Sequence, residues 1–457
     1  MYVSPFASSY DQVDFALAMH RYDLLNMQPH FPGYPYFILG GMLVHRFIED
    51  PSEALAIFNG IIFSSASIPM FLLCKKYVNK VDSFLVTVIL QSIVYFNICV
   101  TQSMSEGAAI GLLWWYLWSL IKANQSHNVY VKILPLFLFS LLLGVRLSYF
   151  PFGVGILLLW WNDWKSKRIH SRRQLVGFII LAILFQFIWI MGVAMSEGSL
   201  IGFIKLSYEF TIGHFQDWGG TVVTETEVPF FFRFIKIVFL NILWVGLFSE
   251  SLFILLLYTF LLVLYLKGNK QKKVDVTFIV LGVAYFLWAF LGQNIDKPRH
   301  ILPLVNVLGF YFFTSLLLNS VRKKWIYLLL TTLLLSQLSI STMYIKSQAT
   351  EIPATYQLSY FLSQQKEDVS VYTWEESRIM DYLEVDYKHE KIYSYDYFLQ
   401  KIHQEKHDTI YVTSHVVNGF KDQGIDVRSN IELVHTFRSN KLFDPVYYTI
   451  DLYEWKR

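Results

Sequence analysis

Charged side chains are scarce in this chain of 457 residues, since Asp, Glu, Lys and Arg together make up only 16% of it. Soluble globular domains usually carry about 25%. Hydrophobic residues reach 54% and aromatic residues 18%. This composition excludes an ordinary soluble protein and indicates a polytopic α-helical membrane protein. The formal net charge is only +3, so no nucleic-acid partner is expected.

Cysteine is almost absent as well. Only Cys74 and Cys99 occur, both within apolar segments, so the sequence predicts neither a disulfide framework nor a cysteine metal site. The GxGxxG, P-loop and GxSxG patterns are also missing. Any chemistry must therefore rest on the few acids, cations and histidines of the chain.

Long apolar runs are abundant. Their lengths suit about ten membrane spans. The runs fall near residues 53–74, 82–101, 104–122, 130–147, 149–162, 174–195, 250–267, 274–293, 301–319 and 325–345. Two further apolar segments, 33–48 and 230–248, are predicted to lie on the outer surface, because the first is short and the second carries Arg233 and Lys236.

Basic residues gather in short loops between these runs, around residues 75–80, 165–173, 267–273 and 322–324. Positively charged loops stay in the cytoplasm. The opposite, extracytoplasmic side then receives four parts of the chain. They are residues 8–35, the loop 196–230, the loop 294–300 and everything after about residue 346.

The last part of the chain has a mixed, soluble-like composition. VSVYTW, TIYVTS, ELVHTF and VYYTIDLYEW have the pattern of strands, whereas EESRIMDYL and YDYFLQKIHQ have the pattern of helices. We therefore predict a transmembrane domain at residues 1–345. A small extracytoplasmic α/β domain follows at residues 346–457.

Acids crowd near the N-terminus, in SSYDQVDF. Ser9 and Gln12 have the spacing of a capping box, which predicts a helix from about Tyr10. Asp11 and Asp14 then share one face of that helix. A purely structural alternative is that Asp11 only complements the helix dipole, while Asp14 pairs with Arg21 or with water.

Proline-rich sequence follows that helix. His30 lies in QPHFPGYP, and the prolines hold it in a stiff turn. Farther along, Glu106 begins one apolar run in QSMSEGAAIG and Arg146 ends another in GVRLSYFP. Ionisable groups at membrane depth face a partner or a polar cavity. Structural pairing and the lining of a cavity both remain open for these two residues.

Two outer loops complete the set of candidates. GHFQDWGGTVVTE supplies His214, Asp217 and Trp218, with a glycine pair that lets the loop bend over a site. NIDKPRHILPL carries three basic residues, Lys297, Arg299 and His300. Such a set can bind a phosphate, although anchoring to lipid headgroups is an equal alternative.

Together these groups predict an outer-surface cavity with carboxylates at one wall and cations at another. A lipid-linked sugar phosphate suits such a cavity. The cations would bind the phosphate leaving group, and a carboxylate would take the proton of an attacking hydroxyl.

DQVDF, QPHFPGYP and PRHILPL resemble, in this order, the motifs of the GT-C superfamily of integral membrane glycosyltransferases. This superfamily includes protein O-mannosyltransferases and aminoarabinose transferases, and the resemblance covers roughly residues 8–345. It implies an inverting transfer of a hexosyl or pentosyl group from a polyprenyl-phosphate donor to an extracytoplasmic acceptor. The acceptor would be a surface glycan, a lipid or a protein, and the enzyme would lie in a bacterial plasma membrane.

The resemblance also implies residue roles. Asp11 takes the catalytic acidic position, His30 matches the histidine of the turn and Arg299 matches the late arginine. Gln12 stands where many members have a second acid, so a metal held by an acid pair is not supported, and no cofactor is expected. Members also carry a span ahead of the acidic loop, whereas only MYVSPFASSY precedes Asp11 here. We therefore expect that span upstream of Met1.

Two other classes of function stay open. A transporter or flippase of a lipid-linked intermediate also needs polar groups between spans, but such proteins place them near the midplane of paired halves. This chain concentrates them at one surface, which favours chemistry. The third class is a membrane-anchored binding protein whose outer domain does the work.

Overall fold

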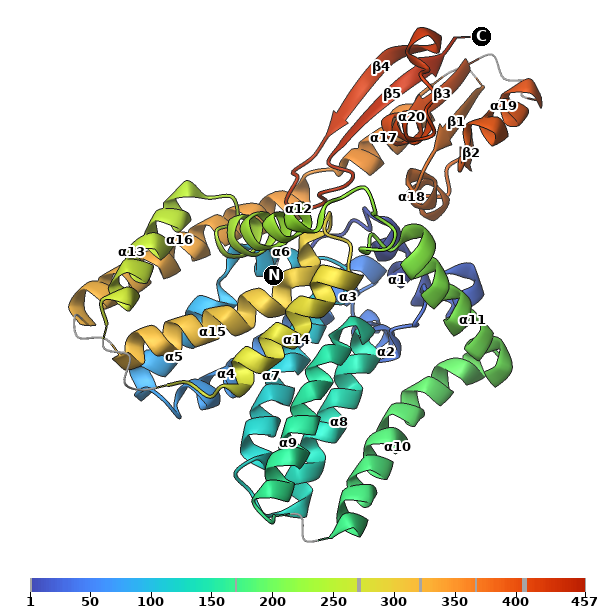
Figure 1. The fold of residues 1–457 in the computed structure, drawn as a ribbon. Coiled ribbons are helices and arrows are strands. Elements are labelled where there is room, and N and C mark those ends of the chain that lie inside the picture. Colours follow the sequence, from blue (N-terminus) through green and yellow to red (C-terminus); the bar gives the residue numbers. More distant parts are fainter. Residues whose placement is uncertain are drawn as a thin grey trace.

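The computed structural model of the chain describes residues 2–168, 171–268, 273–319, 323–365, 368–404 and 409–456. A large helical body carries a smaller domain with a five-stranded sheet, and helices α16 and α17 lead from one to the other (Figure 1). Of the basic residues in the predicted cytoplasmic loops, Lys270, Lys272 and Arg322 lie outside the described residues.

The helical body comprises sixteen labelled helices among the described residues. They are α1 (Tyr10–Ala18), α2 (Pro35–His45), α3 (Pro51–Ser65), α4 (Ser67–Cys74), α5 (Lys80–Gln91), α6 (Val94–Val100), α7 (Glu106–Ala123), α8 (Val129–Val145), α9 (Val154–Lys165), α10 (Arg172–Ser196), α11 (Leu200–Gly213), α12 (Phe230–Ile235), α13 (Leu252–Leu266), α14 (Thr277–Gly292), α15 (Leu302–Asn319) and α16 (Lys323–Thr350). Short 3₁₀ turns at Leu24–Asn26, Leu147–Gly153 and Pro298–Ile301 and π-helical segments at His214–Trp218 and Lys236–Leu247 connect or extend them.

Several of these helices are suited to a bilayer. Within the described ranges, 5 helices are long and apolar enough to cross a membrane, or up to 6 if α5 and α6 count as one bent span. Shorter apolar helices, including α8, α13 and α14, accompany them. The chain is thus built as an integral membrane protein, while the predicted number of about ten spans stays a prediction.

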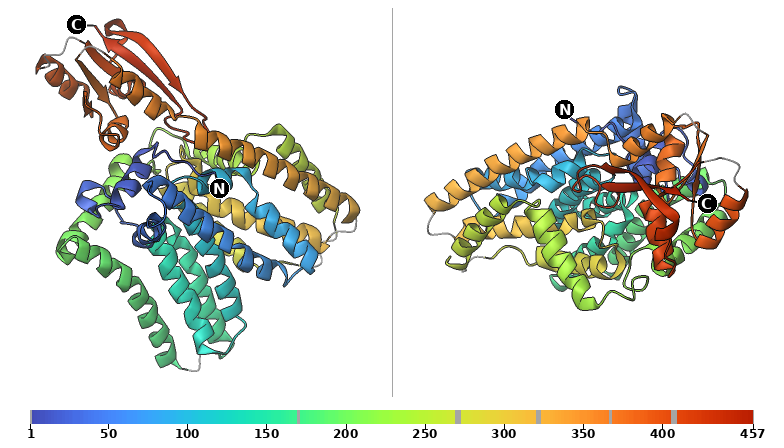
Figure 2. Two further views of the ribbon diagram at one scale, coloured as in Figure 1. Left: turned by 180° about the vertical axis from the view of Figure 1, so that it is seen from behind. Right: turned by 90° about the horizontal axis from the view of Figure 1, so that it is seen from above.

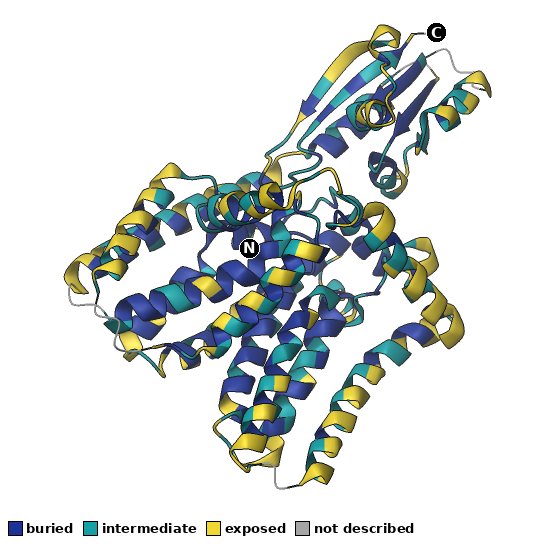
Figure 3. Ribbon diagram, viewed as in Figure 1, coloured by how far each residue is buried: buried dark blue, intermediate teal, exposed yellow. Residues whose placement is uncertain are grey.

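Helix α10 shows most clearly how the body meets lipid. Its exposed side chains include Ile180, Ile183, Leu184 and Ile188, and Figure 3 shows it as a largely unburied helix at the edge of the body. An apolar helix with so little burial would be unstable in water. In a bilayer the same surface packs against acyl chains.

Two predicted boundaries differ in the structure. The run 82–101 forms α5 and α6, bent by 59°. At the break, Ser92 Oγ donates a hydrogen bond to Gln337 Oε1 of α16 (2.9 Å), so a side-chain contact stabilises the point where the helix ladder is interrupted. The outer loop 196–230 is also not irregular throughout. Most of its first half is α11, which begins after the N-cap Ser199.

Helices α7 and α3 pack closely against each other in the helical body. A Cβ added at Gly111 would lie 2.5 Å from the carbonyl oxygen of Ile62, and one added at Gly107 would lie 2.9 Å from Asn59 Cβ. Asn59 also accepts a hydrogen bond from the backbone N–H of Ala108 (2.8 Å). Small residues thus let two helices approach, and they fix the first turn of α7, which carries Glu106.

The C-terminal domain has a mixed sheet in the order β2-β1-β3-β5-β4. Strand β1 is parallel to β2 and β3, whereas β5 is antiparallel to β3 and β4. The elements of the domain are α17 (Ala354–Ser363), β1 (Val369–Thr373), α18 (Glu376–Tyr382), β2 (Lys388–Lys391), α19 (Tyr395–Gln404), β3 (Thr409–Thr413), α20 (Ser414–Asp422), β4 (Ile431–Arg438) and β5 (Thr449–Trp455).

Apolar side chains cover both faces of this sheet. Leu358 of α17 and Met380 of α18 pack with Val371 on one face. Phe398 of α19 and Phe420 of α20 pack with Tyr372 on the other. The four predicted strands and two predicted helices are confirmed, and β2, α17 and α20 are additional.

The glycine packing yields a stability test. Gly111→Ala should lower the free energy of unfolding by about 1–3 kcal/mol, because the new methyl group overlaps the α3 backbone. The control is Gly192→Ala in α10, where an added Cβ has nothing within 4 Å. Thermal unfolding in detergent measures both. Equal melting temperatures for the two variants would contradict the α3–α7 contact.

Candidate active site

Helix α1 begins at Tyr10, as the sequence predicts. Gln12 Oε1 accepts hydrogen bonds from the backbone N–H groups of Ser8 (2.7 Å) and Ser9 (3.2 Å). The Gln12 half of the capping box therefore forms, and it satisfies two donors that would otherwise be free at the start of the helix. This places Asp11 in the first turn.

A chain of ion pairs connects α1 with the helical body. Arg299 Nη2 lies 2.6 Å from Asp11 Oδ2, and Arg299 Nε lies 3.2 Å from Glu106 Oε1. Arg146 Nη2 lies 3.0 Å from the same Glu106 oxygen, and Arg146 Nη1 donates a hydrogen bond to Ser105 Oγ (2.9 Å). Four residues predicted from separate segments therefore form one network.

The two acids of this network differ in exposure. The Glu106 side chain is 1% exposed, between two guanidinium groups, whereas the Asp11 side chain is 27% exposed. Removing one partner of a buried ion pair leaves an uncompensated charge, which is costly. Glu106 thus holds the two arginines from the interior of the helical body, and Asp11 is the carboxylate available to a ligand.

Asp11 faces a cavity of about 430 Å³. Its polar lining includes Asp11, His30, Tyr34, Arg146, Ser148, Thr211, His214, Gln293, Asn294, Lys297, Arg299 and His300. Its apolar wall includes Phe15, Phe31, Leu147, Phe150, Phe210, Phe215, Trp218 and Trp288. A charged end beside an aromatic wall suits an amphipathic ligand with an anionic group.

The charge balance at the polar wall is positive. Arg146, Lys297 and Arg299 face Asp11 and the underlying Glu106. Burial raises the pKa of Asp11, but the nearby charges of Lys297, His30 and the two arginines outweigh it and hold that pKa well below its usual range. Asp11 is therefore a carboxylate at physiological pH, and the wall can accept a further anion.

His30 is held at both ring nitrogens. Its Nδ1 lies 3.1 Å from Asp14 Oδ2, and its Nε2 lies 3.1 Å from the hydroxyl of Tyr34. The peptide bonds Gln28–Pro29 and Phe31–Pro32 on either side are cis. Asp14 is fully buried and does not line the cavity, so it can act on a ligand only through His30.

The structural alternative for Asp14 is wrong about its partner. Helix α1 ends at Ala18, before Arg21, whose exposed guanidinium pairs with Asp23 (2.7 Å). The cation that pairs with Asp14 is Arg378 of α18, at 2.9 Å. Burial raises the pKa of Asp14 despite the hydrogen bond from His30 and the charge of Arg378.

The loop after α11 contributes His214 and Trp218 to the cavity, but not the expected Asp217. His214 and Trp218 line the cavity, and His214 Nε2 lies 2.8 Å from the carbonyl oxygen of Gly292. Asp217, in the π-helical turn, is exposed and does not line the cavity. Tyr34 and Trp288 were not anticipated, since no signal distinguishes them among so many aromatic residues.

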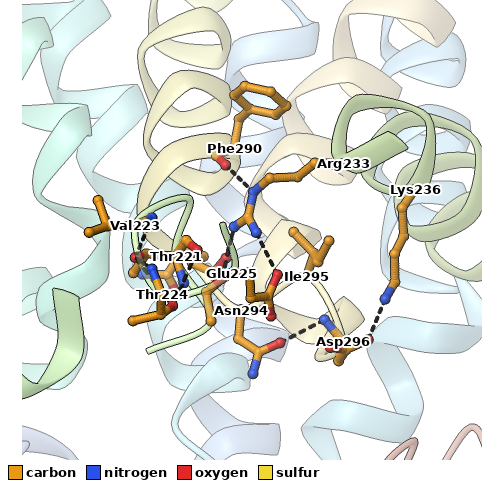
Figure 4. A network of polar contacts seen from close by, with 12 residues as sticks. Thr221, Val223, Thr224, Glu225, Arg233, Lys236, Phe290, Asn294, Ile295 and Asp296 are labelled. Atoms are coloured by element: carbon orange, nitrogen blue, oxygen red, sulfur yellow. Dashed lines mark hydrogen bonds and ion pairs between the residues drawn. The ribbon is translucent and has the colours of Figure 1, made fainter. Parts of the chain in front are cut away.

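Arg233 clamps the segment that precedes Lys297 (Figure 4). Its guanidinium donates to the carbonyl oxygens of Phe290 (2.6 Å), Gly220 (2.9 Å) and Gln293, and to the carboxylate of Glu225 (2.9 Å). The side chain is 1% exposed. Arg233, a charged residue in an apolar segment, therefore joins the loop 219–225 to the end of α14.

Metal ligands are not grouped within the described ranges. No cluster of three or more His, Cys, Asp or Glu residues in them is placed to hold an ion. The expectation that the site works without a cofactor stays a prediction.

Comparisons with known proteins place the fold. No family model and no curated protein sequence matches the chain. Its fold is nevertheless similar to that of ArnT in two solved structures. ArnT from Cupriavidus metallidurans in the apo state aligns over 99% of this chain and 93% of its own, with a TM-score of 0.53 and 9% identity. The same protein bound to undecaprenyl phosphate aligns over 99% and 94%, with a TM-score of 0.52 and 10% identity.

The Arg233 clamp can be tested without an activity assay. Arg233→Met should increase hydrogen exchange of residues 219–225 and 290–297, because four acceptors lose their donor. Lys236→Met is the matched control, since Lys236 pairs only with the half-exposed Asp296 and such pairs contribute little. Unchanged exchange in Arg233→Met, measured by mass spectrometry, would rule out the clamp.

Proposed function

We propose that this chain is a glycosyltransferase that moves a sugar from a polyprenyl-phosphate donor to an extracytoplasmic acceptor. The observation that carries this proposal is the Asp11–Arg299 pair (2.6 Å) in a cavity with a cationic and an aromatic wall. The GT-C fold supports it, and a structure of ArnT with this fold is bound to undecaprenyl phosphate.

The donor would lie with its phosphate at the cationic wall. Arg299 offers a planar guanidinium for two phosphate oxygens, and Lys297 adds a point charge. The first isoprene units would pack on the aromatic wall, against Phe150, Phe215 and Trp288. Glu106 keeps Arg299 oriented while the phosphate replaces Asp11 at its outer nitrogen.

The reaction would be a single displacement with inversion, transferring a hexosyl or pentosyl group. The acceptor hydroxyl or amine attacks C1 of the sugar, and the bond from C1 to the phosphate oxygen breaks. The electron pair stays with the polyprenyl phosphate, whose added charge Arg299 and Lys297 stabilise. The acceptor loses its proton to Asp11 or, with Asp11 orienting the nucleophile, to solvent.

The remaining predicted residues would shape this site. Arg146 holds Glu106, His300 lies beside Arg299, and His30 with Asp14 forms the wall next to Asp11. We place the cavity in a transmembrane domain of residues 1–345 and the sheet in a domain of residues 346–457. The cavity and the sheet domain would both lie on the extracytoplasmic side of a bacterial plasma membrane. The site would work with no metal or other cofactor.

Replacing the acid tests the chemistry. Asp11→Asn should lower kcat for sugar transfer by about 100-fold or more, because the amide can neither take the proton nor attract the nucleophile equally well. Transfer from polyprenyl-phosphate sugars in membranes is the measurement. Glu209→Gln, an exposed acid on α11, is the control. Equal rates for Asp11→Asn and wild type would refute the role of Asp11.

Replacing the arginine tests the donor site. Arg299→Lys keeps the charge but not the planar fork, so undecaprenyl phosphate should bind about tenfold more weakly. The increase in melting temperature with added undecaprenyl phosphate measures binding. Arg21→Lys, whose side chain is 73% exposed, provides the control. Unaltered binding by Arg299→Lys would place the phosphate elsewhere.

A further inference from the structure

The C-terminal domain contacts the helical body directly above the cavity. Figure 1 shows α18 over α1, and these two helices pack together. The view from behind in Figure 2 shows the domain on the same end of the body. In α17, the Tyr356 hydroxyl accepts a hydrogen bond from the backbone N–H of Ala7 (3.2 Å), and Thr355 Oγ1 donates one to the carbonyl oxygen of Ser8 (3.1 Å). The domain is therefore docked next to the helix that bears Asp11.

Arg378 provides the charged contact of this interface. Its Nε and Nη2 lie 3.0 Å and 2.9 Å from Asp14 Oδ1. Its Nη2 also donates to the carbonyl oxygens of Asn26 (3.1 Å) and Met27 (3.0 Å), in the turn that leads to His30. One guanidinium therefore compensates a fully buried acid and fixes the backbone ahead of the cavity histidine.

Asp14 contacts both Arg378 and His30 and therefore connects them. Its other carboxylate oxygen, Oδ2, lies 3.1 Å from His30 Nδ1, so a proton on Nδ1 is donated to Asp14, and this contact orients the ring and its second nitrogen, Nε2. Tyr34 lies at that nitrogen. Both His30 and Tyr34 line the cavity, as Asp11 does. A residue of the sheet domain is thus two contacts away from His30, a residue of the cavity wall.

A second part of the domain packs into the helical body. The connection between β4 and β5 places Leu442 within the core of the helical body, and Gln102 Nε2 donates to the carbonyl oxygen of Phe443 (2.8 Å). Asp444 Oδ2 is buried and, among the described residues, has no hydrogen-bond partner. Burial raises the pKa of Asp444, while the charges of Arg299 and Lys297 act on it in the opposite sense.

We propose that the sheet domain is part of the active site and that Arg378 is a positioning residue, which holds His30 toward the substrate through Asp14. This inference rests on the proposed function, because the substrate is the one proposed for the cavity. It assigns the C-terminal domain a role in the transfer step itself. Arg299 and Lys297, which would bind the donor phosphate, do not contact Arg378 in this arrangement.

Kinetics of the full-length protein in nanodiscs test the positioning role. Arg378→Gln should lower kcat by about tenfold, because misplacing a group in the site slows the reaction, and should leave KM for the donor within about twofold. Since Arg378 acts through Asp14, Asp14→Asn with Arg378→Gln should be no slower than Asp14→Asn alone. Multiplying losses in the double variant, or a loss confined to KM, would overturn the proposal.

A second measurement does not depend on activity. Diethyl pyrocarbonate modifies unprotonated imidazole nitrogens, and peptide mass spectrometry can follow His30 alone. Its modification rate should rise about fivefold in Arg378→Gln, because the ring loses its fixed partner. Thr355→Val, which removes a different contact of the same interface, should leave the rate and kcat unchanged.

The outcomes separate the two proposals. A modification rate of His30 that is the same in wild type and Arg378→Gln overturns the coupling, whatever the enzyme does. A wild-type protein that transfers no sugar from any polyprenyl-phosphate donor, but whose His30 still responds to Arg378, overturns the proposed function and leaves the coupling in place.

Discussion

One buried carboxylate organises the structure around the cavity. Glu106 lies between Arg146 and Arg299, and its side chain is 1% exposed. Without it Arg146 would lose the acid it pairs with, and Arg299 would keep only Asp11, although an unpaired charge in a low-dielectric interior costs several kcal/mol. The Asn59 amide and the glycines of α7 hold the turn that carries Glu106. Packing of two apolar helices thereby decides where a polar site can exist.

Around this point, segments far apart in the chain are arranged in layers. Arg299 contacts Glu106 through Nε and Asp11 through Nη2, and the Arg233 clamp fixes the loop that precedes Lys297. The sheet domain covers the opposite side through Arg378. The cavity thus combines a fixed cationic wall, an aromatic wall and a carboxylate.

The sequence revealed the charged members of the site because charge is rare in an apolar chain. Asp11, Glu106, Arg146 and Arg299 each interrupt an apolar or proline-rich context, and the predicted membrane topology puts them on one side. It could not reveal Arg378, which lies in a domain where charges are common, or the aromatic wall. The fold class followed from composition, whereas the α5–α6 bend depends on a contact with Gln337 far along the chain.

The position of β5 has a consequence for biosynthesis. It is the last strand of the sheet in chain order, yet it lies between β3 and β4 and pairs with both. Until residues 449–455 leave the ribosome, β4 has no neighbour and the two halves of the sheet remain separate. The helical body can insert into the membrane during translation, but Arg378 reaches Asp14 in a folded domain only afterwards. Assembly of the complete site is therefore a late, post-insertion event.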